Sequence, residues 1–422
     1  MNYVKTWRSR ERTLKLIRED PTESFQQLPS YFYMLEQTNS GTVTKLEVDG
    51  HNRFKYCFMA LGASIEGWVH CRPVIVVDGT YQNGHYGGTL FTSCTQDANN
   101  SIFVLAFSVG DNENDASWTW FLENLKGAYG NREGHCLVLD RHNSIKTAVE
   151  QVYPGTSHGI YTYHFLQNLK SHFGKSGHNI TPPFNLAVHT YTLSDFEYNK
   201  QQLDTINKKI RVTKVVKNYP IIALLDSLQQ TIQSWFFKNK DTTYDTFTKL
   251  STKYEKMMRE MSTSLRNTRM TIIFVTLHHI HIYVTWWNIQ YGSSFVVDIE
   301  KRTCTCRMLQ VDQMPCPHAL VVIATTKRDP YDYCSYFYTR EAYINAYQNI
   351  VYPVRNPNEW IVAPKVEDVI VLAPNQKRSS GRPTEKRRRS CIKGKQTVKC
   401  GCCEGSGHNH RTCNNLLPLA KK

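Results

Sequence analysis

The sequence predicts a mixed α/β protein followed by small cysteine-rich modules. Short apolar runs of strand length come first and then alternate with amphipathic helical patterns, which is typical of layered α/β folds. Hydrophobic residues make up 41% of the 422 residues and aromatic residues 12%, enough for a large core. The 13 cysteines include two clusters whose spacing suits metal ligands better than disulfides. We therefore expect a folded core with metal-binding modules after it.

The expected elements follow in chain order. Residues Asn2–Asn39 have helical periodicity, with a break at Pro21. Strands are then expected at Val43–Val48, Phe54–Leu61, Val74–Val77, Thr89–Cys94 and Ile102–Val109. The alternating part consists of helix Ala116–Tyr129, strand Cys136–Leu139, helix Ile145–Tyr153 and strand Ile160–Tyr163. Helical periodicity dominates from Leu193 to Arg266.

These patterns divide the chain into seven expected segments. They are a lead-in (1–66), the α/β core (67–175), a mainly helical region (176–290), a cysteine–histidine module (291–326), a helical extension (327–372), a basic linker (373–398) and a second cysteine–histidine module (399–414). The apolar window Met270–Trp287 contains three histidines and is short for a membrane span, so we interpret it as buried core. Met1–Asp20 is charged and does not resemble a signal peptide, which favours the cytosol or nucleus.

The charge balance favours a polyanionic partner. Lys and Arg number 51 against 36 Asp and Glu, which gives a formal net charge of +15. Each Lys or Arg placed on a phosphate releases a condensed counterion, so nucleic acid is the natural partner. The alternative is a protein that simply has a basic surface. The concentration of Lys and Arg in Lys377–Lys395 favours nucleic acid.

The first cluster of candidate metal ligands consists of Cys304, Cys306, Cys316 and His318. Three thiolates and one imidazole suit the tetrahedral coordination of structural zinc. A strand-like run, Phe295–Ile299, precedes the cluster, and the apolar helix Ala319–Thr325 follows it. The pattern CxC…CxH and the flanks "VVDIEKRTCTC" and "MPCPHAL" resemble the SWIM zinc finger. The alternative is a chance grouping of four residues.

The second cluster consists of Cys400, Cys403, His408 and Cys413. This is the spacing of a zinc knuckle, a module that binds single-stranded nucleic acid. The alternative is a disordered tail with chance cysteines. The remaining cysteines are expected to be spare or buried thiols: Cys57, Cys71, Cys94, Cys136, Cys334, Cys391 and Cys402.

A basic segment lies between the two clusters, and we expect it to be disordered. The tripeptide Gly381-Arg382-Pro383 with basic flanks resembles an AT-hook, whose arginine enters the minor groove of A·T-rich DNA. The candidate DNA contacts are Arg382, Lys386, Arg387, Arg388 and Arg389. The run Lys386–Arg389 equally fits a nuclear localisation signal, and a solvated linker is the third interpretation.

Two aspartates end apolar strands and form a candidate catalytic pair. Asp78 lies in "RPVIVVDGTY" and Asp140 in "CLVLDRH". Carboxylates at the ends of neighbouring strands can share Mg²⁺ ions, as two-metal phosphoryl transfer requires. On the pattern alone, each aspartate could instead cap a turn or a helix.

Longer stretches around both aspartates resemble the transposase domain of plant Mutator-like elements. The similar segments include "RPVIVVDGTYQNGHYGGTLF", "TQDANNSIFVLAFSVGDNENDASWTWFLENLK" and "LVLDRHNSIKTAVEQVYPGTSHGIYTYHFLQNLK". The likeness continues through "NYPIIALLDSLQQTIQSWFFKNK", the finger pattern and "YDYCSYFYTREAYINAY". It implies a ribonuclease-H-like core with a helical insertion and a catalytic triad of two aspartates and one glutamate. Asp78 and Asp140 match the two aspartates.

The chain departs from that family pattern at two places. The family's Cys-x-x-His pair has become Tyr161 with His164, and a phenol does not replace a thiolate as a soft ligand. The segment that carries the family's third carboxylate is missing: Glu197 lies in another motif, and Lys208–Lys217 contains no acidic residue. Asp226 is the candidate substitute, although its helix face is expected to pack on the core.

The leading hypothesis is a transposase-derived nuclear protein that binds zinc and DNA and has lost its catalytic activity. The expected DNA partner is terminal-inverted-repeat or A·T-rich DNA, and zinc is the expected structural cofactor. An active transposase that uses Mg²⁺, and a domesticated transcription regulator, are the alternatives. We expect no membrane segment and no small-molecule substrate, and the sequence leaves homo-oligomer formation open.

Overall fold

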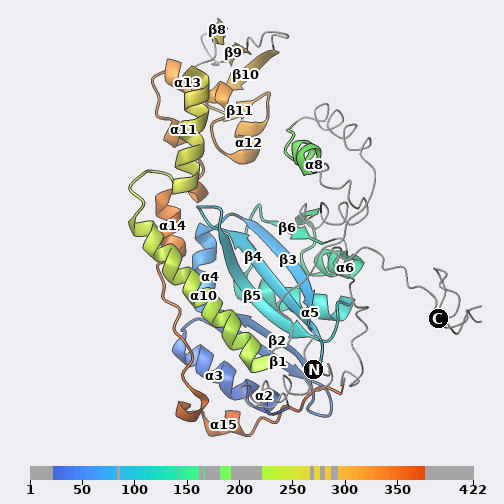
Figure 1. Ribbon diagram of the computed structural model, residues 1–422. Helices are drawn as coiled ribbons and strands as arrows, with labels where there is room; N and C mark the ends of the chain where they lie inside the picture. The colour runs from blue at the N-terminus through green and yellow to red at the C-terminus, as the bar shows by residue number, and fades with distance from the viewer. Residues whose placement is uncertain are drawn as a thin grey trace, which may run out of the picture. The chain divides into compact units, whose positions relative to one another are not determined.

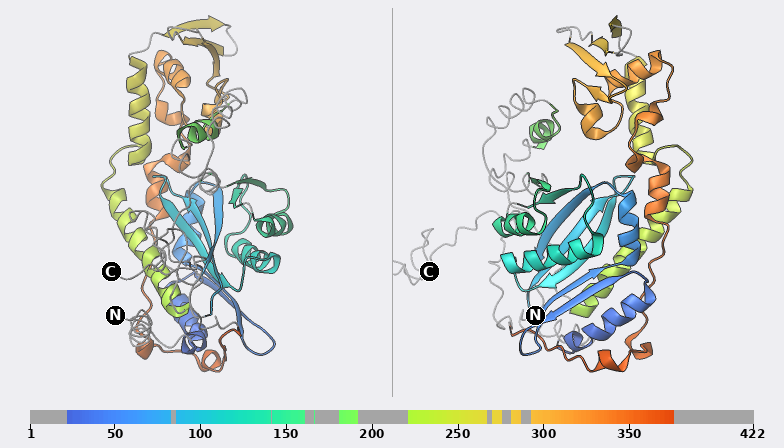
Figure 2. Two further views of the ribbon diagram at one scale, coloured as in Figure 1. Left: turned by 45° about the vertical axis from the view of Figure 1, so that its right-hand side comes forward. Right: turned by 180° about the vertical axis from the view of Figure 1, so that it is seen from behind.

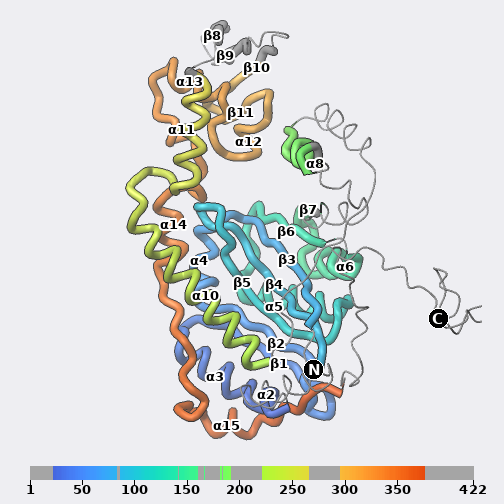
Figure 3. The backbone as a smooth tube through the Cα atoms, in the orientation of Figure 1, coloured from blue at the N-terminus to red at the C-terminus, as the bar shows by residue number. Residues whose placement is uncertain are grey.

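The structure is a computed structural model that describes residues 22–82, 86–140, 142–160, 166, 181–191, 221–266, 270–275, 281–286 and 293–375 (Figure 3). The chain divides into the units Met1–Lys377 and Arg378–Lys422, and all described residues belong to the first. The expected helix before Pro21, the basic linker from Lys377 and the second cysteine cluster lie outside the described residues. The same holds for Tyr161, His164 and Glu197.

A seven-stranded sheet forms the centre of the α/β core, with the strand order β1-β2-β5-β4-β3-β6-β7 (Figure 1). The strands are β1 (Val43–Val48), β2 (Phe54–Ala60), β3 (Val74–Tyr81), β4 (Thr89–Gln96), β5 (Ile102–Gly110), β6 (Cys136–Leu139) and β7 (Ser157–Ile160). The pairs from β1 to β3 are antiparallel, whereas β3–β6 and β6–β7 are parallel. The parallel pairs follow the helical crossovers that parallel strands require.

Helices cover both faces of this sheet (Figures 1 and 2). α5 (Asp115–Tyr129) and α6 (Asn143–Val152) lie on one face, and α4 (Gly62–Gly67) and α10 (Ile221–Tyr244) lie on the other. α5 begins where the Asn114 side chain accepts the backbone N–H of Ser117 at 2.9 Å. Its buried face places Trp118 and Phe121 against Phe91 of β4, inside the main hydrophobic core. Such buried aromatic pairs stabilise the layer between helix and sheet.

The remaining described elements flank the sheet or build the second half of the unit. α2 (Glu23–Gln26) and α3 (Leu28–Thr38) precede β1, and η1 (Trp68–His70) follows α4. Later elements are α8 (Thr181–Val188), α11 (Thr252–Arg266), α12 (Met308–Asp312), α13 (Pro317–Thr325), η3 (Pro330–Tyr333), η4 (Tyr336–Tyr338), α14 (Arg340–Ala346), η5 (Pro357–Glu359) and α15 (Pro364–Glu367).

A second, four-stranded antiparallel sheet has the order β11-β10-β9-β8. Its strands are β8 (Met270–Val275), β9 (His281–Trp286), β10 (Ser293–Asp298) and β11 (Thr303–Cys304). The apolar window Met270–Trp287 therefore contains two paired strands, where the sequence predicted a mainly helical region up to residue 290. Because β9 pairs with β10, this sheet begins before the expected module boundary at 291.

The structure agrees with most predicted strands and helices and shifts some of their ends. β1 and β6 have the predicted bounds, while β3 extends to Tyr81 because it pairs with Thr89–Phe91 of β4. The strand expected at Ile160–Tyr163 lies at Ser157–Ile160, in register with β6. The extension 327–372 contains only short helices. No helix among the described residues is long and apolar enough to span a membrane.

Candidate metal centre and carboxylate pair

Four predicted ligands come together at the second sheet. The ligand atoms of Cys304, Cys306, Cys316 and His318 all lie within 4.8 Å of one another. His318 Nδ1 is 3.7 Å from Cys304 Sγ and 3.9 Å from Cys316 Sγ. Zinc–sulfur bonds of about 2.3 Å and zinc–nitrogen bonds of about 2.0 Å give ligand separations close to these in a tetrahedron. The donor set and its spacing therefore fit one zinc ion, with Nδ1 as the histidine ligand atom.

Local structure explains how each ligand reaches this position. Cys304 is the last residue of β11 and pairs with Val297 of β10. Cys316 caps α13: its Sγ accepts the backbone N–H of Ala319 at 3.4 Å, and Pro317 occupies the first turn. Proline suits that turn because its missing N–H has no helical partner there. The His318 ring stacks on Phe295, with 3.7 Å between ring centroids, so its orientation is fixed by the sheet.

The protonation behaviour of the thiols favours a bound cation. The hydrogen bond with Cys306 raises the pKa of Cys304 to about 11. Contact with Cys304, then with Cys306, and burial raise the pKa of Cys316, whereas the hydrogen bond from Cys304 lowers that of Cys306. The neighbouring sulfur atoms thus favour ionisation of the Cys306 thiol and oppose ionisation of the other two thiols. A divalent cation removes this conflict because it binds all three thiolates and releases their protons.

Of the two predicted catalytic aspartates, Asp78 lies on β3 and Asp140 directly follows the adjacent parallel strand β6. Val76 of β3 pairs with Val138 of β6, and Asp78 and Asp140 each follow two residues later. Both side chains are half-buried. Successive side chains of a strand point to opposite faces of the sheet, and the buried Val77 points toward α5. The Asp78 side chain therefore lies on the face opposite α5. Burial, and next the Asp78 carboxylate, raise the pKa of Cys94 on β4 to about 11, which places the Asp78 charge near that thiol.

Another carboxylate, not identified from the sequence, lies beside the same strand but on the other face of the sheet, together with Trp118 of α5. A Cβ atom added to Gly79 would lie 2.8 Å from Glu113 Cδ and 2.9 Å from Glu113 Oε1. Glu113 comes from the loop between β5 and α5, far from the segment where the family carries its glutamate. Only the absent side chain at Gly79 allows this approach. Asp226, the candidate substitute, is half-buried on α10, where burial raises its pKa.

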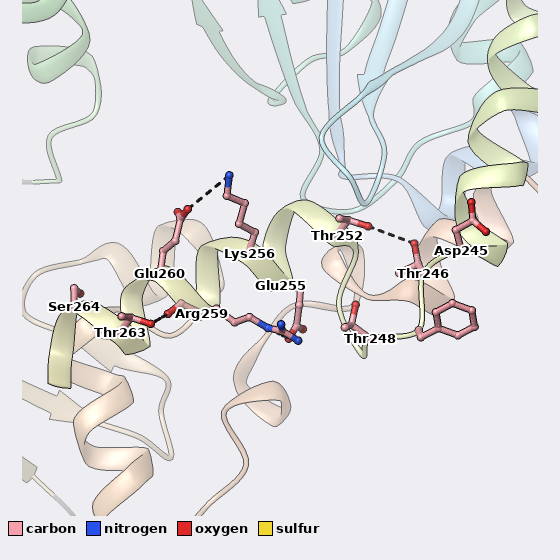
Figure 4. A pocket seen from close by; sticks show the side chains of 11 residues that line it. Asp245, Thr246, Thr248, Thr252, Glu255, Lys256, Arg259, Glu260, Thr263 and Ser264 are labelled. Atoms are coloured by element: carbon pink, nitrogen blue, oxygen red, sulfur yellow. Dashed lines mark hydrogen bonds and ion pairs between the residues drawn. The ribbon is translucent and has the colours of Figure 1, made fainter.

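An open groove lies elsewhere, along α11 (Figure 4). It has a volume of about 790 Å³, and residues 245–248 and the polar face of α11 line it. Four of its charged side chains pair with one another: Lys256 with Glu260 at 3.8 Å and Arg259 with Glu255 at 2.9 Å. Asp245 also lines the groove, so three acidic side chains stand against two basic ones.

The α/β core and the geometry of the Cys–His cluster indicate a protein with a zinc-finger module. Comparison with known families identifies what each part is similar to. The MULE transposase domain matches residues 74–168, which contain Asp78 and Asp140. The SWIM zinc finger matches residues 284–327, which contain all four clustered ligands. The chain therefore contains a segment similar to the MULE transposase domain and a segment similar to the SWIM zinc finger.

A curated protein also matches part of this chain. The chain is similar to FAR1-RELATED SEQUENCE 10 of Arabidopsis thaliana, with 24% identity over 128 residues. The match covers 30% of this chain and 19% of that protein. The aligned part thus represents about a fifth of the relative's length.

Proposed function

We propose that this protein is a DNA-binding, zinc-dependent derivative of a transposase whose catalytic site is defective. The placement of Asp78 on β3 and of Asp140 directly after the paired strand β6, within the matched MULE segment, is the observation that carries the proposal. The strand order β5-β4-β3-β6-β7, an antiparallel meander followed by two parallel strands, supports a ribonuclease-H-like core. Zinc would be held by Cys304, Cys306, Cys316 and His318, where it supplies local folding energy.

The proposed defect concerns the number of carboxylates. Two-metal phosphoryl transfer holds two ions about 4 Å apart on the attacking and leaving oxygens. Among the described residues, one group of three or more possible ligand side chains lies close enough together to hold a metal ion. It consists of Cys304, Cys306, Cys316 and His318, and does not include Asp78 or Asp140. Mg²⁺ needs near-octahedral oxygen coordination, so two carboxylates without a third hold the pair of ions poorly. We therefore expect no Mg²⁺-dependent chemistry at this site.

An active transposase is the second candidate function, and the placement of Asp78 beside Asp140 is the observation that favours it. Glu113 lies against Gly79 on the α5 face of the sheet, so it does not join this pair. The test incubates the full chain with terminal-repeat DNA and Mg²⁺ or Mn²⁺. We expect no strand cleavage. Cleavage that disappears in both Asp78→Asn and Asp226→Asn, and persists in Glu113→Gln, would contradict the defective site and identify Asp226 as the third carboxylate.

DNA binding is tested through its dependence on salt. Each phosphate contact contributes about −0.9 to the slope of log K against log salt concentration. If Arg382, Lys386, Arg387, Arg388 and Arg389 contact phosphates, replacing all five with Gln should reduce the magnitude of the slope by about 4.5. The matched control removes five exposed lysines of the described part: Lys45, Lys146, Lys238, Lys253 and Lys365. An equal slope in the tail variant and the parent would exclude these residues as the main contacts.

Nuclear import is the proposed role of the same basic run. A fluorescent fusion of the full chain should accumulate in nuclei. Replacing Lys386–Arg389 with Ala should reduce that accumulation, because import receptors recognise short basic runs. Unchanged nuclear signal in the variant would assign import to another segment.

A further inference from the structure

The backbone of one metal ligand, Cys304, is held by a side chain. The Gln310 amide accepts the backbone N–H of Cys304 with Oε1 at 3.1 Å and donates from Nε2 to the Cys304 carbonyl at 2.8 Å. Gln310 belongs to α12, which follows the Cys304–Cys306 turn directly. A single side-chain amide thus binds both the backbone N–H and the backbone carbonyl of a residue that carries a ligand atom.

The register of β10 and β11 explains why Cys304 needs such a partner. Thr305, the next residue, makes two hydrogen bonds with Val296 of β10. Its N–H donates to the Val296 carbonyl at 3.0 Å, and its Oγ1 accepts the Val296 N–H at 3.0 Å. Polar backbone groups alternate in direction along a strand, so those of Cys304 point to the outer edge of the sheet. Gln310 occupies that edge in place of another strand.

The turn after Cys304 depends on the same contact. Arg307 donates its N–H to the Cys304 carbonyl at 2.8 Å and adopts a left-handed conformation with φ 64°. That conformation is costly for a residue with a side chain. The second bond to the Cys304 carbonyl, from Gln310, therefore helps to hold the tight path from Cys304 through Cys306 into α12.

We propose that Gln310 is a positioning residue of the SWIM zinc site, an inference that rests on the proposed zinc binding of this finger. With the amide in place, Cys304 Sγ and Cys306 Sγ are held toward Cys316 and His318 before the metal arrives. Without it, the Cys304 N–H loses its partner and the turn must be ordered when zinc binds. Residues that orient metal ligands through such contacts typically change metal affinity 10- to 100-fold when replaced.

The test measures zinc affinity of the full chain by competition with a chelator. All proteins carry Cys400→Ser and Cys403→Ser, so the second candidate cluster does not contribute. We expect Gln310→Ala to bind zinc about tenfold more weakly than the parent. Gln310→Glu should fall between them, because a carboxylate accepts the Cys304 N–H but does not donate to its carbonyl. The control is Val311→Ala, an exposed neighbour on the same helix, with unchanged affinity.

Cobalt substitution separates positioning from loss of a ligand. The visible spectrum of Co²⁺ bound to Gln310→Ala should match that of the parent, because all four ligands remain. If the zinc affinity of Gln310→Ala lies within twofold of that of the Val311→Ala control, the positioning role of Gln310 is overturned and the proposed zinc site is not. A parent that binds no zinc would overturn both the proposed zinc site and the inference.

Discussion

At the scale of single residues, Asp97 is the most tightly held carboxylate of the described core. It is fully buried at the end of β4. Its Oδ1 accepts the backbone N–H groups of Asn99 at 2.9 Å and Ser101 at 2.7 Å, and the Tyr347 hydroxyl donates to Oδ2 at 2.8 Å. Burial nevertheless outweighs these bonds and raises the pKa of Asp97 from 3.8 to about 6. The folded protein therefore binds a proton here more tightly than the unfolded chain.

This carboxyl should make stability fall as the pH rises. The stabilisation is fully present below the unfolded pKa of 3.8 and is lost as the pH passes the folded pKa of about 6. Between pH 5 and 7.5 the loss amounts to roughly 1 kcal/mol. In Asp97→Asn this contribution is absent. The measurement is the free energy of unfolding of both proteins across this range, and a constant difference between them would contradict the shifted pKa.

At the scale of elements, Gly67 allows α4 to approach α14 closely. A Cβ atom at Gly67 would lie 2.4 Å from the Ala346 carbonyl oxygen and 2.7 Å from Phe103 Cζ. Its backbone is helical, with φ −68°, so the constraint is spatial and not conformational. The helix pair can therefore reach this separation only with glycine at the contact.

Gly67→Ala should destabilise the core by about 2 kcal/mol, because overfilled contacts against backbone cannot relax easily. The control is Gly127→Ala on α5, where no atom lies within 4 Å of the new Cβ. That change should stabilise the protein by about 0.5–1 kcal/mol, since alanine is the better helix former. Chemical denaturation measures both. Equal effects of the two substitutions would show that α4 and α14 do not pack this closely.

The elements also show which features can be predicted from sequence. β1 and β6 were predicted because their apolar runs match the strands residue for residue. β7 begins three residues earlier than predicted, because its pairing with β6, and not the local run of apolar residues, decides its position. The four SWIM ligands were predicted because their spacing is local. The position of Glu113 beside Gly79 and the contacts of Gln310 were not, since both arise only in the folded chain.

At the scale of the whole described unit, two arginines join the α/β core to the second half. Arg72, before β3, lies over the rings of Tyr338 at 4.8 Å and Tyr254 at 5.3 Å. Arg132 lies over Trp68 at 4.7 Å and Phe337 at 4.9 Å. Such cation–π contacts between partly buried groups stabilise the joint.

The same joint continues into the zinc finger. Tyr338 donates its hydroxyl to the Asp312 carbonyl at 2.6 Å. It also shares a hydrophobic cluster with Met314 and Leu320, which flank the ligands Cys316 and His318. The metal centre is therefore only one layer of side chains away from the core.

Removal of zinc should consequently loosen the finger and the joint while the main sheet stays folded. Without metal, loss of the bonds between the ion and its four ligands frees the loop before Cys316, so Met314 and Leu320 lose their fixed positions. Hydrogen exchange should accelerate over residues 303–325 and in α11 around Tyr254. Exchange in β5 should not change, because its contacts lie within the main core. Cys316→Ser should reproduce the effect of a chelator, whereas Cys334→Ser, outside the cluster, should not. Accelerated exchange in β5 after chelation would show that the core itself depends on the metal.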